Sequence, residues 1–443
     1  MTLILRNVRP WGGENCDLAI VAGRISARGL ALPRGSKEID GGGGLILPGL
    51  HDHHLHLLAT AVRRQSVSLA GLTSGEQIHA ALAAAPGASL RAVDYDERAC
   101  GLPDTRLLDS WVPDRPLRLA DRTGALWVLN SAAMQRLASR ELPAGAERDG
   151  QGHPTGRFWR EDRWMRSAFP AALPDLAALG RSLAAVGVTA VTDATAHNGP
   201  EEAGLLAGSL PQRLTLMGSE ALSAGNGYAL GPLKLLIDER DPASPEGLAT
   251  RIGIARSQGR AVAAHCVTEA ELALYLAALE LAGGVRRGDR VEHGGMVPAE
   301  FISLLSAAGL TVVTNPAFIH DRGDRYLSEI APDQQEHLYP AAALVRSGVP
   351  VLAGSDAPYA ALDPWLAMRT ARDRLTAAGV SLGPAQRLNA LGALRLYCRG
   401  DLTVGAPADL VMCAGDLPAV LRDLSMDRVR LTMIGGRVVH HAP

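Results

Sequence analysis

The sequence predicts an α/β protein built around a (β/α)8 TIM-like barrel, with a small β-sandwich formed by both termini and an insertion over the barrel mouth. Three observations favour this fold. Short apolar runs alternate with Ala/Leu-rich helical segments, polar residues end several of these runs, and both ends of the chain carry short strand-like runs with turn glycines. The chain has 443 residues, of which 47% are hydrophobic, enough for a large domain with attachments.

Eight strands are expected in the barrel. The first covers residues 45–50, and the others cover 186–193, 213–217, 233–238, 261–265, 290–293, 310–315 and 350–356. Helices are expected between the later strands, at 269–282, 298–308 and 341–347. Eight strand–helix units match the count of a (β/α)8 barrel.

The two ends of the chain differ from the barrel region. Short strands are expected within residues 1–44, with a turn at 22–24, and again in the tail at 405–412 and 431–439. Neither end has enough apolar residues to fold well alone, so we expect residues 1–50 and 401–443 to combine into one sandwich beside a barrel of residues 51–400. The stretch from about 65 to 175 is too long for one barrel loop and predicts an inserted subdomain over the mouth.

Net charge, hydropathy and cysteine content limit which partners and which cellular compartment are expected. The net charge of −2 gives no electrostatic reason to expect nucleic acid or an anionic membrane, so a small-molecule substrate is expected, and a homo-oligomer is left open. No window reaches the roughly 18 apolar residues of a membrane-spanning helix, and the first eight residues do not resemble a signal peptide. The five scattered cysteines suit free thiols in a reducing cytoplasm.

The segment 51–56 packs four histidines and one aspartate into six residues. In an extended strand successive side chains alternate between two faces, so Asp52, His54 and His56 share one face, while His51 and His53 point to the other. Imidazoles at positions i and i+2 can close on one metal ion, and neutral imidazole is a common ligand for zinc. The alternative is a run of histidines that are merely solvated or hydrogen-bonded in the core.

Lysine is rare in this chain, which has two lysines and 42 arginines. One of them, Lys234, lies within the apolar run 232–237. Burying an unpaired ammonium is costly, so this side chain is expected to reach solvent, to pair with an acid, or to be chemically modified.

His265, His293 and Asp356 each lie at the end of a predicted strand. The carboxyl-terminal strand ends form the active-site face of a (β/α)8 barrel, so these residues and the histidine segment are expected to meet. Four neutral imidazoles and one carboxylate would leave most of the charge of two divalent ions uncompensated. A bridging carbamate, formed when the amine of Lys234 reacts with carbon dioxide, would supply a further anion; a plain buried or ion-paired lysine is the alternative.

These motifs resemble those of the amidohydrolase superfamily, and within it the amidohydrolase 3 group of YtcJ-like and N-substituted formamide deformylase-like proteins. The first-strand pattern Pro-Gly-hydrophobic-any-Asp-any-His-any-His is met by Pro48, Gly49, Leu50, Asp52, His54 and His56. The resemblance runs nearly end to end. It is also carried by residues 69–74, 113–116, 130–133, 187–189, 291–293 and 354–358.

The resemblance implies a centre of two divalent metal ions. His54, His56 and Asp356 would bind the more buried ion, His265 and His293 the other, and a carboxylated Lys234 would bridge them. Zinc is the expected metal, although iron, manganese or cobalt would also be held. Two such ions make a hydroxide available as nucleophile, and Asp356, the implied catalytic residue, takes its proton and returns it to the leaving nitrogen.

The sequence departs from the family pattern at two places. Gly124-Ala125 stands where Gly-His often precedes the Asn-Ser pair, which puts one substrate contact from the insertion in doubt. Deaminases of the superfamily usually place a glutamate three residues after the fifth-strand histidine, but here that position is Thr268, with Glu269 one further on. This second departure weakens the interpretation as a deaminase.

A further set of residues is considered for substrate binding. They are polar or aromatic residues of loops expected to face the site, and for each the alternative is a solvated or simply packed residue: His197, His320, Arg322, Asp324, Arg325, Trp159 and Tyr359.

The expected function is metal-dependent hydrolysis of an amide-type C–N bond, linear or cyclic, by a metal-activated hydroxide. An ester or lactone hydrolase would use the same site, and a heterocycle deaminase is the alternative among other enzymes. A non-catalytic scaffold is disfavoured, because such barrels typically lose ligands and this chain retains all six candidate residues.

Overall fold

The computed structural model describes residues 2–169, 174–237, 244–398 and 400–442. The chain divides into two compact units, one made of Met1–Leu57 and Leu176–Pro443 and the other of Leu58–Asp175. The first unit contains two sheets and the second unit one, and each unit has its own hydrophobic core. Among the described helices, none combines the length and the apolar character needed to cross a membrane.

The first unit contains an eight-stranded parallel barrel sheet of order β19-β18-β17-β16-β15-β14-β13-β6. Its strands are β6 (Leu50–Leu55), β13 (Val188–Asp193), β14 (Arg213–Gly218), β15 (Ala229–Leu235), β16 (Val262–Cys266), β17 (Arg290–His293), β18 (Thr311–Thr314) and β19 (Val351–Ala353). Most side chains of these strands are buried, as expected for a parallel sheet covered by helices. The expected (β/α)8 barrel is therefore confirmed.

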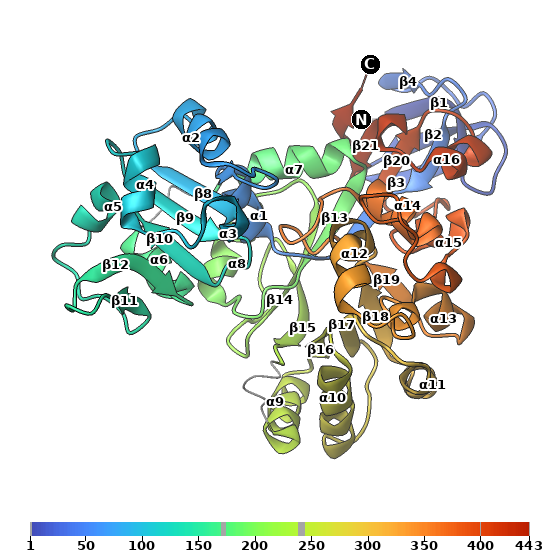
Figure 1. Cartoon of the computed structure of the whole chain (residues 1–443). Helices are drawn as coiled ribbons and strands as arrows, with labels where there is room; N and C mark the ends of the chain where they lie inside the picture. Colours follow the sequence, from blue (N-terminus) through green and yellow to red (C-terminus); the bar gives the residue numbers. More distant parts are fainter. Residues whose placement is uncertain (1, 170–173, 238–243, 399, 443) are drawn as a thin grey trace. The chain divides into compact units, whose positions relative to one another are not determined.

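Helices of the first unit lie outside the barrel sheet, as Figure 1 shows for α9, α10, α11 and α13. Their bounds are α7 (Leu176–Ala185), α8 (Pro200–Leu206), α9 (Pro245–Ser257), α10 (Glu269–Leu281), α11 (Ala299–Ala308), α12 (Ala317–Glu329), α13 (Ala341–Arg346), α14 (Pro364–Asp373), α15 (Ala390–Arg395) and α16 (Leu417–Asp423). One expected strand–helix unit is incomplete, because residues 219–228 connect β14 to β15 without a helix. Asp238, the expected end of a strand, lies outside the described residues.

The strand expected at residues 45–50 is wrong as a barrel strand. Leu45–Pro48 forms β5, which pairs antiparallel with β20 (Leu410–Cys413) in the terminal sheet, and the first barrel strand begins only at Leu50. Gly49 separates the two strands at a point where a Cβ atom would lie 2.1 Å from Oγ1 of Thr189. The apolar run 45–50 therefore contributes to two sheets, and hydrophobicity alone could not show where one strand ends and the next begins.

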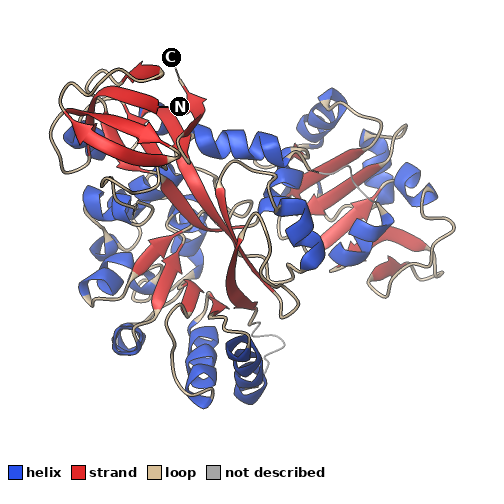
Figure 2. Ribbon diagram, turned by 180° about the vertical axis from the view of Figure 1, so that it is seen from behind, coloured by secondary structure: helices blue, strands red, loops and turns tan. Residues whose placement is uncertain are grey.

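The two termini form one β-rich region (Figures 1 and 2). The strand order is β22-β21-β20-β5-β1-β2-β3, and β4 pairs with β1. Besides β5 and β20, the strands are β1 (Thr2–Pro10), β2 (Cys16–Val21), β3 (Arg24–Gly29), β4 (Lys37–Asp40), β21 (Val429–Ile434) and β22 (Arg437–His441). Leu5, Leu18, Leu410 and Met433 share one core, so neither end of the chain buries its apolar side chains alone.

The second unit is built on a six-stranded sheet of order β11-β12-β10-β9-β8-β7. Its strands are β7 (Val67–Ser68), β8 (Leu90–Tyr95), β9 (Leu117–Asp121), β10 (Leu126–Leu129), β11 (Ala146–Arg148) and β12 (Pro154–Trp159). Its helices are α2 (Gly75–Ala84), α3 (Glu97–Cys100), α4 (Thr105–Trp111), α5 (Ser131–Gln135) and α6 (Asp162–Ala168), while α1 (Leu57–Arg64) begins at the boundary between the units.

Close packing joins the last barrel strand to the first. The amide of Asp356 donates to the carbonyl of His54 (2.7 Å), and the amide of His56 donates to the carbonyl of Ala357 (2.8 Å). At Gly354, an added Cβ atom would lie 2.4 Å from the backbone nitrogen of His54. Only a residue without a side chain fits this contact.

Gly354→Ala is expected to lower the free energy of unfolding of the metal-free protein by about 1–3 kcal/mol, the usual cost of overpacking. Denaturant unfolding measures the change. Gly253→Ala in α9 is the matched control, because no atom lies within 4 Å of the added methyl group. The control should be neutral or stabilise by up to about 1 kcal/mol, and equal effects of the two variants would contradict the packing argument.

Candidate metal centre

His54, His56 and Asp356 converge at the carboxyl end of the barrel sheet. His54 lies in β6, His56 follows it, and Asp356 follows β19. The Nε2 atoms of His54 and His56 lie 3.3 and 3.1 Å from Oδ1 of Asp356. One ligand atom from each of the three residues lies within 4.8 Å of the others, close enough for a shared metal ion.

His293 connects this group to His265. Its ring centroid lies 4.6 Å from that of His54 and 4.5 Å from that of His265, and its Nδ1 lies 4.0 Å from Oδ2 of Asp356. His293 and Asp356 have backbone φ angles of 71° and 55°, in the left-handed region that side chains other than glycine rarely adopt. Such strained residues concentrate at functional sites.

Lys234 points into the interior from β15 and is only 2% exposed. Among the described residues, its Nζ has no hydrogen-bond partner and forms no ion pair. Burial lowers the pKa of this amine, and the nearby carboxylates of Glu292 and Asp356 only partly offset that effect. At a given pH, a larger fraction of this side chain is therefore in the neutral amine form than in an ordinary lysine.

The donor set fits a divalent cation. Within the described part of the chain, Nε2 of His54 and Oδ1 of Asp356 are buried atoms without a hydrogen-bond partner. Buried polar atoms in proteins normally have partners. Two such atoms lie only 3.3 Å apart here, so one bound group could be the partner of both. Imidazole nitrogen and carboxylate oxygen are both ligands of zinc.

Three residues that hold the histidines were not predicted as site residues. Nδ1 of His54 hydrogen-bonds to Oε2 of Glu292, Nδ1 of His56 lies 2.9 Å from Oγ1 of Thr195, and Nδ1 of His293 lies 2.8 Å from Oδ1 of Asn315. Glu292 had two signals in the sequence, a charge within a buried strand and a place in the family-like motif 291–293. Asn315 is the polar last residue of the expected strand 310–315, and Thr195 follows the expected strand 186–193, but neither was singled out.

Glu292 is a fully buried carboxylate. Burial by itself would raise its pKa, but the positive charges of Arg290, Lys234 and His54 reverse this effect, and the pKa is held well below its usual range. Glu292 is therefore an anion at neutral pH.

His51 and His53 lie away from the cluster, as strand alternation predicts. Their rings stack at 3.8 Å, and Nε2 of His51 lies 2.9 Å from Oγ1 of Thr192. Burial lowers the pKa of His51 to about 3, so it packs as a neutral ring.

Two of the residues considered for substrate binding are near the cluster. Tyr359 lies beside His56, and Arg322 contacts Tyr359. The ring of Tyr359, which is 57% exposed, lies edge-on to that of His56 at 5.7 Å. The guanidinium of Arg322 stacks on Phe318 and donates to the carbonyl of Tyr359 (3.2 Å).

The other candidates have contacts elsewhere. His320 and Asp324 lie in α12, where His320 pairs with Asp321 at 2.8 Å and Asp324 accepts a hydrogen bond from Thr376. Arg325 pairs with Glu329 (2.7 Å) one turn along that helix. His197 is an exposed residue of the loop after β13. Trp159 belongs to the second unit, where its indole donates to Glu147 (2.9 Å).

A family model described as "Amidohydrolase family" matches residues 37–440. The chain belongs to the amidohydrolase family. It is 24% identical to a putative amidohydrolase YtcJ of Bacillus subtilis, over 91% of this chain and 90% of that protein. It is 25% identical to an N-substituted formamide deformylase of Arthrobacter pascens, over 86% and 83%.

A solved structure of an uncharacterized metal-dependent hydrolase from Pyrococcus horikoshii has the same fold. It superposes with a TM-score of 0.77 at 18% identity, over 94% of this chain and 98% of that one. The predicted family is thus confirmed by the family model and by the two relatives, and the solved structure shows that the fold is shared.

In this amidohydrolase, Thr268 caps a helix. Its Oγ1 accepts from the amide of Glu271 (3.2 Å), and Glu271 in turn accepts from the amide of Thr268 (3.1 Å), so the pair forms a capping box at the start of α10. Glu269 is exposed in the first turn of that helix. The position three residues after His265 is therefore a helix cap without a carboxylate.

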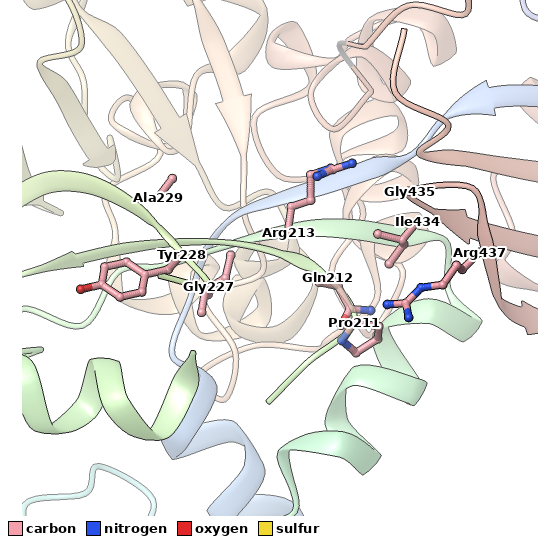
Figure 3. Close-up of a pocket in the computed structure, with 10 residues that line it drawn as sticks. Pro211, Gln212, Arg213, Gly227, Tyr228, Ala229, Ile434, Gly435 and Arg437 are labelled. Atoms are coloured by element: carbon pink, nitrogen blue, oxygen red, sulfur yellow. The ribbon is translucent and has the colours of Figure 1, made fainter. Parts of the chain in front are cut away.

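The cleft in Figure 3 lies at the opposite end of the barrel strands. It has a volume of about 500 Å³ and is lined by the first residues of β14, β15 and β22, which are Arg213, Ala229 and Arg437. None of the six predicted metal ligands lines it, so it is separate from the candidate centre.

Metal binding is expected to weaken as the pH falls from 8 to 6. Burial and Lys234 lower the pKa of His54, but Glu292 and Asp356 raise it by more than that, so the net shift is upward. A proton therefore competes for Nε2 of His54 near neutral pH, costing about tenfold in affinity per pH unit for each proton displaced. Competition with a chromogenic chelator measures this, and an affinity independent of pH over this range would contradict it.

Proposed function

We propose that this amidohydrolase cleaves an amide-type C–N bond, linear or cyclic, at a centre of two divalent ions, most simply zinc. His54, His56 and Asp356 would hold one ion, and His265 and His293 the other. Lys234, carboxylated on Nζ, would bridge them. The observation that carries the proposal is the convergence of three ligand atoms within 4.8 Å, two of them buried without hydrogen-bond partners.

Divalent ions at this centre would supply a Lewis acid for the scissile carbonyl and would lower the pKa of water toward neutrality. The chain supplies the proton transfer. The carboxylate of Asp356 accepts the proton of the attacking water and gives it to the leaving nitrogen as the C–N bond breaks. Its anionic form is supported because, although burial would raise its pKa, the neighbouring imidazoles of His54 and His56 hold that pKa well below its usual range.

The buried amine of Lys234 suits carboxylation. The neutral nitrogen attacks the carbon of carbon dioxide, an N–C bond forms, and one proton leaves to give the anionic carbamate. The lowered pKa of Lys234 favours the neutral amine that this reaction needs. Carboxylation would also replace a buried amine that has no hydrogen-bond partner among the described residues by an anion that divalent ions can bind.

The bond that is cleaved can be tested with a hydrolysis screen over N-acyl amino acids, formamides, cyclic imides and lactones. Turnover of amides or imides by the metal-loaded enzyme is expected. Ester or lactone turnover alone would contradict the amide assignment, and ammonia release from a heterocycle would identify a deaminase instead.

Purified protein is expected to bind about two divalent ions per chain, and Lys234→Ala is expected to lose metal and activity, with partial rescue by short carboxylic acids that replace the bridging anion. Metal analysis and activity assays measure both effects. Lys37→Ala is the matched control, because it removes the only other lysine, which is exposed in β4. Full metal occupancy in Lys234→Ala would exclude the bridging role.

A further inference from the structure

Two metal-ligand candidates of the centre have side-chain partners that can only accept a hydrogen bond. Nδ1 of His54 faces Oε2 of Glu292, and Nδ1 of His293 faces Oδ1 of Asn315 at 2.8 Å. A neutral imidazole carries one hydrogen, which can lie on either ring nitrogen. The partner of one nitrogen therefore decides which nitrogen keeps a lone pair for a metal.

The amide of Asn315 has one allowed orientation. Its Nδ2 donates to the carbonyl of Gly354 (2.9 Å). The reversed amide would place Oδ1 against that carbonyl, so two acceptors would face each other. Oδ1 of Asn315 therefore points to His293, and Nδ1 of His293 must carry the hydrogen.

Glu292 is also held on both sides. Its Oε1 accepts from Nε of Arg290, and Nη2 of Arg290 donates to the carbonyl of His53 (3.1 Å). A carboxylate bound to a guanidinium accepts hydrogen bonds only. Nδ1 of His54 therefore donates, and Nε2 is the atom that faces Asp356 at 3.3 Å.

His56 lacks such a constraint. Its Nδ1 lies 2.9 Å from the hydroxyl of Thr195, which can either donate or accept. This contact is compatible with either tautomer and adds no charge.

We infer that Glu292 and Asn315 are positioning residues that force His54 and His293 to coordinate through Nε2, with Glu292, braced by Arg290, the stronger of the two. The inference rests on the metal centre of the proposed function. Partners of this kind orient the ring and raise the basicity of the ligating nitrogen, and their loss typically weakens metal binding about 10–100-fold.

The test measures zinc affinity by chelator competition for the wild type, Glu292→Gln, Asn315→Ala and the control Thr192→Val, which removes a hydroxyl that contacts His51, a ring away from the cluster. Glu292→Gln is expected to bind zinc 10–100-fold more weakly, Asn315→Ala less severely so, and Thr192→Val within about threefold of the wild type. Circular dichroism and melting of the metal-free proteins check that each variant is folded. Affinities of folded Glu292→Gln and Asn315→Ala within threefold of the wild type would overturn the inference.

A second measurement needs no variant. In zinc-loaded wild-type protein labelled with ¹⁵N-histidine, His54 and His293 should show a protonated Nδ1 and a ligating Nε2. Coordination through Nδ1 would overturn the inference while leaving the proposed function intact. A wild-type protein that binds no divalent ion would overturn both.

Discussion

Between the first and the last strand of the barrel, hydrogen bonds join residues 303 and 302 positions apart in the chain. Oδ1 of Asp52 accepts from the amide of Ser355 (2.9 Å), and the carbonyl of His54 accepts from the amide of Asp356 (2.7 Å). We call this row of hydrogen bonds the seam. His54 and His56 lie on one side of it and Asp356 on the other. The candidate centre therefore exists only while the barrel is closed, and Gly354 allows the two segments to approach closely enough.

Charge is arranged around this seam with little access to water. Lys234, Glu292 and Asp356 are all at least 95% buried, and Arg290 reaches Glu292 from the same strand. Buried ionised groups are costly unless each has a partner of opposite sign. Glu292 has two hydrogen-bonded partners, whereas Lys234 and one oxygen of Asp356 have none among the described residues, so the electrostatic balance is incomplete at the position where cations are proposed to bind.

Much of this arrangement could be predicted from residue patterns. Strand alternation separated His54 from the stacked pair of His51 and His53, and polar residues at strand ends indicated His265, His293 and Asp356. Hydrophobicity could not separate β5 from β6, because the apolar run 45–50 contains all of β5 and also the first residue of β6. Residues such as Asn315 and Thr195 were missed because their importance comes from contacts across strands, which have no periodic signature in the sequence.

The seam also has a consequence for protein synthesis. His54 and His56 leave the ribosome with about 300 residues still to be made before Asp356, an interval of roughly 15–60 s at typical elongation rates. During that time the nascent chain carries a histidine-rich strand whose barrel partner on one side does not yet exist. The barrel cannot shield this segment from metal ions or from misassembly during that interval, since it closes only after residue 356 has been added.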